Sequence, residues 1–243
     1  LLKSSGVFGE VVSATAHSLG AIGLHHYGST NQTTLVVSNG PLGMRARLPK
    51  RLFDTAVAAL ALLLLSPLLV LVAAATKLED GGPMFFVQRR MGKDNRLFDI
   101  FKFRSMRLVD QDDSGLKPTG RQDARITRIG AFIRKNSIDE LPQLLNVPKG
   151  DMSLVGPRPH ALGSTASDQL YWKADRQYLL RHSLKPGLTC LAQIRGFRGT
   201  TEHTKDLTDR LGADLEYIST WSLARDAEIL VRTLGVLRHH NAY

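Results

Sequence analysis

The chain of 243 residues contains one cysteine, Cys190, so it cannot form an internal disulfide bond. Its cysteine content therefore requires no oxidising compartment and fits soluble parts that face a cytoplasm. The sequence also lacks a P-loop, a Rossmann glycine pattern, a Gly-x-Ser-x-Gly elbow and a zinc motif. Its eight histidines show no metal-ligand spacing. The signatures of several large enzyme classes are thus missing.

Acidic residues are in the minority. The chain has 22 Asp and Glu against 32 Lys and Arg, which gives a net charge of +10 at neutral pH. Such an excess favours an anionic partner, whether nucleic acid, anionic lipid or a phosphorylated substrate. The length allows one good-sized core, or a core with an appendage.

The first 43 residues carry little charge and no sustained hydrophobic period. Lys3 and Glu10 are their only charged residues, and Val11-Val12 and Val36-Val37 are the candidates for short strands. We therefore expect residues 1–47 to be a poorly ordered N-terminal extension. Met44 precedes a basic cluster, so an alternative is that the protein starts there and residues 1–43 are upstream sequence.

Residues 55–76 contain no charge and consist mostly of Leu, Ala and Val. About 22 helical residues at about 1.5 Å each span about 33 Å, enough for the hydrocarbon core of a bilayer. Pro67 at the midpoint removes a backbone hydrogen bond, and the Ser66 hydroxyl can bond the freed carbonyl. Basic residues flank both ends, so the positive-inside rule gives no direction of crossing. We favour a re-entrant helix over residues 48–76, broken at Ser66-Pro67; the alternative is a kinked transmembrane helix.

Residues 77–243 are predicted to form a globular α+β unit without another membrane-length run. Residues 85–87 and 98–103 are strand-like and are separated by a turn at 92–95, which predicts a β-hairpin. Residues 126–136, 168–182 and 204–237 have helical hydrophobic spacing. Such basic helices can lie on an anionic membrane surface, or they can be ordinary solvated surface helices.

The stretch from Ser137 to Pro159 concentrates acids, arginine and constrained backbone. Its adjacent acids, Asp139 and Glu140, can share a site because helical neighbours point about 100° apart. One carboxylate could attack phosphorus while the other holds a divalent cation. The structural alternative is a capping box, Ser137-x-x-Glu140, with both acids favouring the helix dipole. The spacing does not choose between these interpretations, and a helix N-terminus can also hold phosphate.

Four cations are candidates for phosphate binding. Arg134 lies about one and a half helical turns before Asp139. Arg158 is presented by the stiff turn Gly156-Pro-Arg-Pro159. Lys102 and Arg104 alternate along a predicted strand and should share one face. A guanidinium binds a pair of phosphate oxygens well. The alternatives are a solvated helix arginine at Arg134, water as the partner of Lys102 and Arg104, and a purely structural turn around Arg158.

The order of these motifs resembles the bacterial sugar transferases, the monotopic polyprenyl-phosphate hexose-1-phosphate transferases. The resemblance covers about residues 48–237, and the C-terminal half, with its Asp214-Leu-Glu-Tyr217 segment, is similar to the glucose and galactose branch. The motifs, in chain order, are Lys50-Arg-Leu-Phe-Asp54, the apolar run with Ser66-Pro67, Gly82-Pro83-x-Phe-Phe-x-Gln88-x-Arg90-x-Gly92, Lys102-Phe-Arg-Ser-Met106, Asp139-Glu-Leu-Pro-Gln143 and Gly150-Asp-Met-Ser-Leu-Val-Gly-Pro-Arg-Pro159.

The resemblance implies a fold and a reaction. The fold would be α+β, a mainly helical monotopic membrane protein with a re-entrant helix-break-helix and a small β-hairpin. The enzyme would transfer a hexose-1-phosphate from a UDP-sugar to undecaprenyl phosphate and release UMP. Asp139 would form the covalent phosphosugar intermediate, Glu140 would hold Mg²⁺, and Arg134 and Arg158 would contact phosphate groups.

The resemblance also implies a setting. Residues 77–243 would be a catalytic domain with C-terminal amphipathic helices, on the cytoplasmic face of the bacterial inner membrane. The product would initiate exopolysaccharide, capsule or O-antigen synthesis. We expect anionic membrane lipids as partners, no nucleic acid, and a possible homodimer through the C-terminal half. The alternatives are a membrane-anchored polyprenyl diphosphate hydrolase and a non-catalytic protein that binds anionic lipid.

Overall fold

The computed structural model describes residues 23–27, 32–36, 42–107, 123–175, 177–197, 201 and 203–237. The chain divides into two compact units, residues 1–40 and 41–243. In the first, strands β1 (Gly23–Tyr27) and β2 (Gln32–Val36) pair in antiparallel register. The segment predicted to be a poorly ordered extension therefore includes a hairpin. The predicted strand at Val11-Val12 lies outside the described residues.

Helix α2 (Met44–Asp80) opens the second unit and has 37 residues. It begins and ends four residues beyond the predicted range 48–76, so the predicted boundaries at 47 and 76 both fall inside it. Of the helices that the structure describes, it is the one long and apolar enough to cross a membrane. It stops at Gly81, whose φ of 73° is a left-handed conformation that glycine adopts without a steric penalty.

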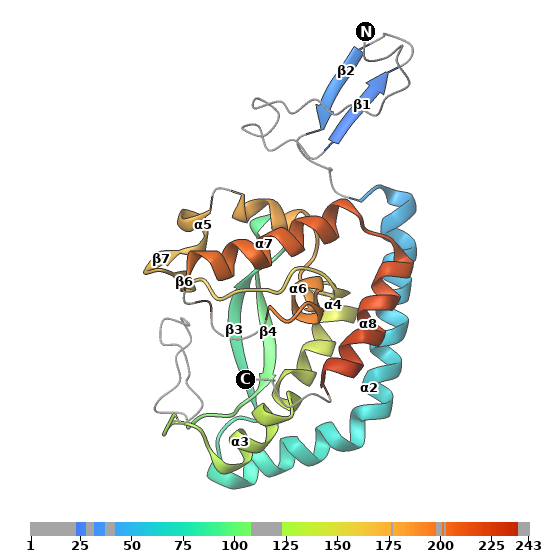
Figure 1. Ribbon diagram of the computed structural model, residues 1–243. Helices are drawn as coiled ribbons and strands as arrows, with labels where there is room; N and C mark the ends of the chain where they lie inside the picture. The colour runs from blue at the N-terminus through green and yellow to red at the C-terminus, as the bar shows by residue number, and fades with distance from the viewer. Residues whose placement is uncertain are drawn as a thin grey trace. The chain divides into compact units, whose positions relative to one another are not determined.

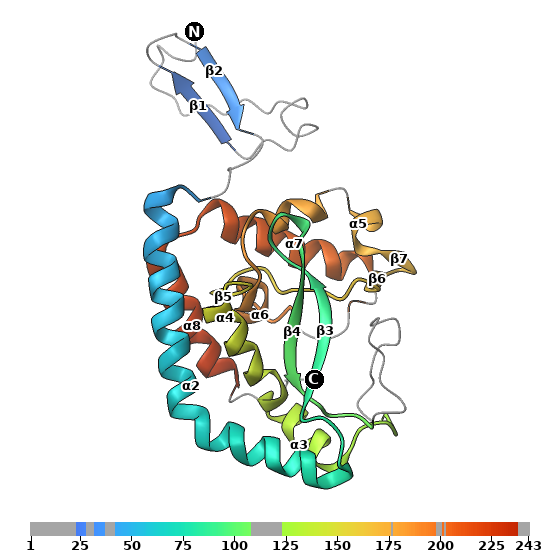
Figure 2. The same cartoon turned by 180° about the vertical axis from the view of Figure 1, so that it is seen from behind.

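The predicted break at Ser66-Pro67 is a bend in a continuous helix. Figures 1 and 2 show α2 changing direction in the part that contains Pro67, with its second arm running toward α3 (Arg128–Lys135). Pro67 cannot donate a hydrogen bond to the carbonyl of Leu63. The Ser66 hydroxyl donates to that carbonyl instead, at 2.8 Å. Because the one bond that proline removes is replaced locally, the helix bends without unwinding.

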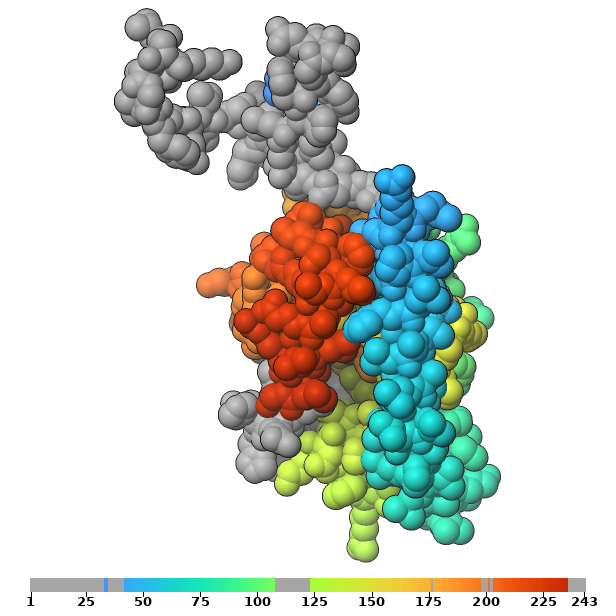
Figure 3. Space-filling model, turned by 90° about the vertical axis from the view of Figure 1, so that its right-hand side faces the viewer, coloured from blue at the N-terminus to red at the C-terminus, as the bar shows by residue number. Residues whose placement is uncertain are grey.

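The two arms of α2 pack on different parts of the core. The first arm contributes Ala58 and its neighbours to the main core, together with Ile100 and Val147. The second contributes Val72 to a smaller cluster with Phe103 and Ile133. The opposite side of α2 is exposed and apolar, and Figure 3 shows the helix as a column along the surface beside α8. Its exposed large side chains are Met44, Leu48, Leu52, Leu60, Leu63, Leu64, Val70, Leu71 and Leu78.

The predicted hairpin is confirmed as strands β3 (Phe85–Met91) and β4 (Leu97–Phe103), joined through the short 3-10 helix η2 (Lys93–Asn95). In its register Phe86 lies opposite Lys102, and Arg90 lies opposite Phe98. Directly paired residues share a face, and alternate residues along a strand share it too. Lys102, Gln88 and Arg90 therefore project from one face of the hairpin.

The elements that follow the hairpin are mostly short helices and strands. The predicted amphipathic helix at 126–136 is confirmed as α3, and the predicted helical segment 204–237 is confirmed as α7 (Thr204–Ser219) and α8 (Leu223–Leu237). The others are η4 (Ile138–Leu145), α4 (Asn146–Lys149), β5 (Ser153–Val155), β8 (Gly187–Thr189) and α6 (Leu191–Ile194). Strands β5 and β8 pair in parallel.

The predicted helix at 168–182 is wrong. The segment holds the short antiparallel pair β6 (Thr165–Ala166) and β7 (Gln169–Leu170), then α5 (Tyr171–Ala174) and the 3-10 helix η5 (Tyr178–Ser183). Ser167 and Asp168 have positive φ angles of 46° and 61°, which make a tight turn where a helix would need negative values. The apolar residues in this segment serve a compact aromatic cluster instead of one helix face.

A buried polar network fastens α2 to the rest of its unit. The Lys50 ammonium lies 2.7 Å from the Asp226 carboxylate, and their side chains are 9% and 0% exposed. Lys50 also donates to the Val155 carbonyl at 3.1 Å. The hydroxyl of Tyr217 donates to Asp226 at 2.6 Å, and Asp54 accepts a hydrogen bond from Ser153 at 2.5 Å. The network joins α2, β5, α7 and α8 at one point.

We predict that Lys50→Met lowers the stability of the protein by about 3 kcal/mol or more, because it leaves a buried carboxylate without its cation. Thermal unfolding in detergent should show a clearly lower midpoint. The double variant Lys50→Met/Asp226→Asn should lose less than the sum of the single variants. As a control, Arg232→Met removes an exposed pair with Glu228 and should change stability by at most about 0.5 kcal/mol. Equal midpoints for Lys50→Met and the control would contradict an anchoring role.

Candidate active site

The acid pair lies at the start of η4, a 3-10 helix. Successive side chains in this helix point about 120° apart, wider than the predicted 100°. The predicted capping box is wrong, because Ser137 has a φ of 55° and its side chain makes no capping hydrogen bond. The left-handed residue turns the chain sharply between α3 and η4. The Glu140 side chain is instead directed at two cations.

Glu140 is held by three charge-assisted hydrogen bonds. Lys102 donates to its Oε1 at 2.8 Å, and Arg158 donates to Oε1 at 2.6 Å and to Oε2 at 3.2 Å. The latter pair is the bidentate geometry typical of arginine with carboxylate. Burial alone would raise the pKa of Glu140, but the charges of Arg158 and Lys102 outweigh it and hold that pKa well below its usual range. Glu140 is therefore ionised throughout the physiological pH range.

Asp139 has the opposite environment. The residue is 8% exposed. Among the residues that the structure describes, none forms a hydrogen bond with its carboxylate. Burial raises the pKa of Asp139 to about 6, and the adjacent Glu140 charge acts in the same direction, whereas Lys102, Arg134 and Arg158 lower it. The carboxylate is thus mostly ionised at neutral pH, yet it is poorly solvated and is not bound to any group in the described part of the chain.

The structure brings three of the four predicted cations to the acids. Lys102 and Arg158 bind Glu140, and Arg134, in the last turn of α3, acts electrostatically on Asp139. Arg104 is placed elsewhere: it is buried and binds the carboxylate of Asp80 and the carbonyl of Thr76. Strand β4 ends at Phe103, so the alternation that predicted a shared face for Lys102 and Arg104 does not continue. Arg104 holds the end of α2.

Close backbone contact fixes the loop that carries Arg158. A Cβ atom at Gly156 would lie 2.4 Å from the carbonyl oxygen of Lys185, and one at Gly187 would lie 2.1 Å from the amide nitrogen of Gly156. Neither position tolerates a side chain. The Gly-Pro-Arg-Pro and Lys-Pro-Gly segments therefore pack directly against each other, next to the paired strands β5 and β8. This packing limits where Arg158 can lie.

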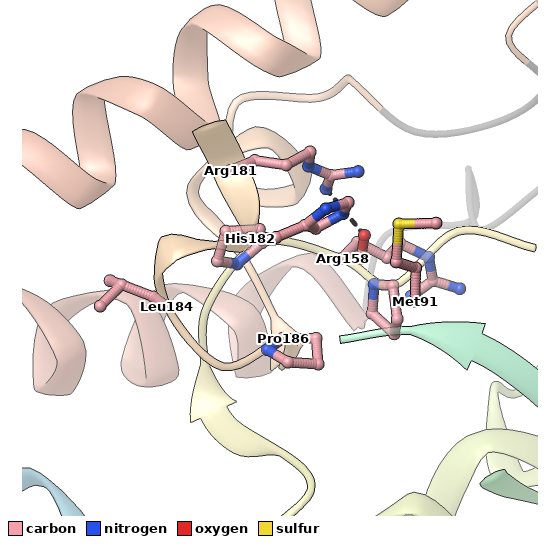
Figure 4. Close-up of a pocket in the computed structure, with 8 residues that line it drawn as sticks. Met91, Arg158, Arg181, His182, Leu184 and Pro186 are labelled. Carbon is pink, nitrogen blue, oxygen red and sulfur yellow. Dashed lines mark hydrogen bonds between the residues drawn. The ribbon is translucent and has the colours of Figure 1, made fainter. Parts of the chain in front are cut away.

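Arg181 is a functional candidate that the sequence did not indicate. Its side chain is 2% exposed and lies 2.6 Å from Asp214. It also donates to the backbone carbonyl of Arg158 at 2.7 Å, as Figure 4 shows. The guanidinium thus ties α7 to the loop that carries Arg158. Asp214 belongs to a motif that is recognisable in the sequence. Its pairing with Arg181 cannot be predicted from that motif, because the contact exists only in the folded chain.

A small pocket of about 10 Å³ adjoins Arg158 and Arg181 (Figure 4). That is room for about one water molecule, so the pocket by itself is too small to hold a nucleotide sugar. The other lining residues are Met91, Pro157, Pro159, His182, Leu184 and Pro186.

The donor set can contribute to a metal site but cannot complete one. Within the described part of the chain there is no group of three or more His, Cys, Asp or Glu that could hold a metal ion. A carboxylate has about four lone-pair positions, and Glu140 uses two at Oε1 and one at Oε2. Oε2 of Glu140 and the unbound carboxylate of Asp139 remain. This set fits Mg²⁺, which is commonly held by one or two carboxylates together with substrate phosphates and water.

The sequence is similar to those of known proteins from one family. The profile of a family described as "Bacterial sugar transferase" matches residues 45–240. An undecaprenyl-phosphate glucose phosphotransferase of Komagataeibacter xylinus is 49% identical over 199 residues, which are 82% of this chain and 37% of that protein. A UDP-glucose:undecaprenyl-phosphate glucose-1-phosphate transferase of Caulobacter vibrioides is 47% identical over 218 residues, 89% of this chain and 80% of that protein.

The exopolysaccharide production protein PSS of Rhizobium leguminosarum bv. phaseoli is 45% identical over 185 residues, 76% of this chain and 92% of that protein. The chain thus spans about a third of the first relative and most of the other two. The matched region includes α2, the hairpin, the acid pair and the Arg158 loop. On this evidence the chain belongs to the bacterial sugar transferase family.

Proposed function

We propose that this protein transfers a hexose-1-phosphate from a UDP-sugar to undecaprenyl phosphate. One observation carries the proposal: a buried, unbound carboxylate, Asp139, lies next to a carboxylate that Lys102 and Arg158 neutralise. A nucleophile needs a free oxygen, and an anionic substrate needs nearby cations. The names of the Komagataeibacter and Caulobacter relatives make glucose the first candidate for the sugar; galactose is the second.

In the first half-reaction, an Asp139 oxygen attacks the phosphorus that bears the sugar. The bond from that phosphorus to the bridging oxygen breaks, and the electron pair leaves with UMP. The sugar phosphate is then an acyl phosphate on Asp139. Burial supports the attack, because few water molecules solvate the oxygen or compete with it for phosphorus. Lys102, Arg134 and Arg158 offset the negative charge that accumulates in the site.

In the second half-reaction, a phosphate oxygen of undecaprenyl phosphate attacks the same phosphorus. The bond to Asp139 breaks, and the electron pair returns to the carboxylate. The product is a polyprenyl diphosphate sugar. Each half-reaction makes and breaks one phosphorus–oxygen bond, so the enzyme ends as it began.

We propose that Mg²⁺ assists and that Oε2 of Glu140 is its protein ligand. When bound, the cation would neutralise charge on the diphosphate of the donor. Arg158 and Lys102 keep Glu140 ionised and fixed, and one lone-pair position of its Oε2 is left for the cation. A polyprenyl diphosphate hydrolase would use the same acids but would need access for water; the low exposure of Asp139 gives it less support.

We propose further that α2 enters the membrane and returns to the same face. Its bend at Pro67, its exposed apolar side and its basic flanks all fit a re-entrant helix at the cytoplasmic face of a bacterial inner membrane. The net charge of +10 favours anionic lipids at that surface. Such a position would hold the site where a soluble nucleotide sugar meets a lipid phosphate. Initiation of exopolysaccharide, capsule or O-antigen synthesis, and a homodimer, stay predictions.

Purified protein with Mg²⁺, undecaprenyl phosphate and a panel of UDP-sugars should release UMP with at least one sugar, glucose first. UMP release should depend on the lipid phosphate over many turnovers, because Asp139 is regenerated only by the acceptor. Phosphate release from a polyprenyl diphosphate without UMP would favour the hydrolase. No UMP from any nucleotide sugar would refute the transferase.

We expect Asp139→Asn to lower turnover at least about a thousandfold, since an amide cannot serve as the attacking oxygen. The matched control is Asp99→Asn, which alters an exposed carboxylate on the far face of the hairpin, paired with Arg89. It should retain activity within about twofold. UMP release under the conditions above is the measurement. An Asp139→Asn enzyme with near-normal turnover would remove Asp139 from the reaction.

Cysteine labelling should place both ends of α2 on the cytoplasmic side. Leu48→Cys and Leu78→Cys, at positions 62% and 85% exposed, should react with a membrane-impermeant maleimide only from that side. Leu63→Cys and Leu71→Cys, at positions 71% and 67% exposed on the protein, should be protected by lipid. The native Cys190 is buried and can be replaced by alanine. Labelling of the two ends from opposite sides would show a transmembrane crossing.

A further inference from the structure

The acid pair lies in an excess of positive charge. Lys102, Arg134 and Arg158 act on Asp139. A fourth cation, Arg90, interacts electrostatically with Arg158 and Glu140. Lys102 and Arg158 pair with Glu140, whereas Arg90 forms no ion pair with a carboxylate in the described residues. A diphosphate diester such as a UDP-sugar is an anion that could pair with it.

Strand register directs Arg90 to the same face as Lys102. Phe86 pairs with Lys102 and Arg90 lies four residues further along β3, so both side chains project from one face of the hairpin. Strand β4 packs against η4, the element that holds the acids. Arg89, the preceding residue, projects from the other face, where it pairs with Asp99 and is 73% exposed. Because successive side chains of a strand point to opposite faces, Arg90 lies on the face of Lys102 and Arg89 lies on the other face.

The hydrogen bonds of Arg90 do not satisfy its charge. Its guanidinium donates to the side-chain oxygen of Gln88 and, at 3.4 Å, to the carbonyl of Pro159, and both acceptors are neutral. Its Nε is buried and has no hydrogen-bond partner among the residues that the structure describes. Burial lowers the pKa of Arg90 to about 10, with the like charge of Arg158 as the second cause. The group is still protonated at neutral pH, and no carboxylate in the described residues forms an ion pair with it.

A purely structural role explains this arrangement poorly. A guanidinium has five N–H donors, and the long bond to Pro159 is a weak reason to keep a half-buried charge there. A buried cation that lacks a counter-ion is costly, and a bound anion removes that cost. The backbone of Arg90 is itself bridged to Ala161, so the side chain starts from a fixed point.

We propose that Arg90, supported by Gln88, binds the nucleotide phosphate of the UDP-sugar, the group that leaves as UMP. The assignment rests on the proposed transferase function. Asp139 must touch the sugar-linked phosphorus. Arg90 lies near Glu140 and the carbonyl of Pro159. The neighbouring phosphate is therefore the one within its reach. When the bridging bond breaks, the electron pair stays on that phosphate, and Arg90 stabilises the added charge.

The test compares Arg90→Met with Arg89→Met, which removes an equal charge one residue away on the opposite face. Binding of UMP to the full chain in detergent, with Mg²⁺, is measured by calorimetry, and UDP-sugar kinetics are measured beside it. We expect Arg90→Met to weaken UMP binding at least about tenfold and to lower kcat/KM for the UDP-sugar similarly. Arg89→Met should stay within about twofold of the unmodified protein in both. The apparent affinity for undecaprenyl phosphate should not change in either variant.

UMP affinity that is equal in Arg90→Met and Arg89→Met would overturn the proposal. If Arg90→Met does not fold, Arg90→Lys is the second variant, because it keeps the charge but loses the planar set of guanidinium donors. It should still weaken UMP binding severalfold. An unchanged UMP affinity in Arg90→Lys would also overturn the proposal. The outcome is separate from the transferase test. A protein that binds UMP through Arg90 but releases none from any UDP-sugar would refute the reaction and keep the binding site.

Discussion

The hydrogen bonds from Lys102 and Arg158 to Glu140 determine what the site can do. Two adjacent carboxylates with little access to water repel each other, and ordinarily one of them would take up a proton. Here Glu140 is neutralised by two cations and stays charged, so the cost of burial falls on Asp139 alone. One acid becomes a fixed anion and the other a poorly solvated, unbound oxygen. That division of roles underlies both the proposed nucleophile and the proposed metal ligand.

The fold serves to keep those partners in place. The hairpin supplies Lys102, η4 supplies the acids, and the β5–β8 pair supplies Arg158. Backbone contact at Gly156 and Gly187 leaves that last loop little freedom, and Arg181 adds a bond to its carbonyl. The network around Lys50 fixes α2 to the same body, so the apolar helix and the site move together. An enzyme that joins a soluble donor to a lipid acceptor needs this fixed distance between membrane and nucleophile.

Local sequence patterns predicted local features. The hairpin, the amphipathic segments at α3 and at α7–α8, and the bond from Ser66 to the carbonyl freed by Pro67 all follow from residues close in the chain. The local predictions that are wrong have the same physical cause. The Ser137 capping box and the Lys102–Arg104 face assumed regular geometry that a left-handed residue and a strand end interrupt. Arg181 and Arg90 gain their meaning only from partners far away in the sequence.

The central claim is that Asp139 carries the sugar phosphate between the two substrates. Its most direct test is peptide mass spectrometry of the protein after brief incubation with the UDP-sugar and Mg²⁺ in the absence of undecaprenyl phosphate. A hexose phosphate adduct should appear on the peptide containing Asp139, and it should disappear when undecaprenyl phosphate is added. An active enzyme that accumulates no adduct, or one that carries it on another residue, would contradict the account.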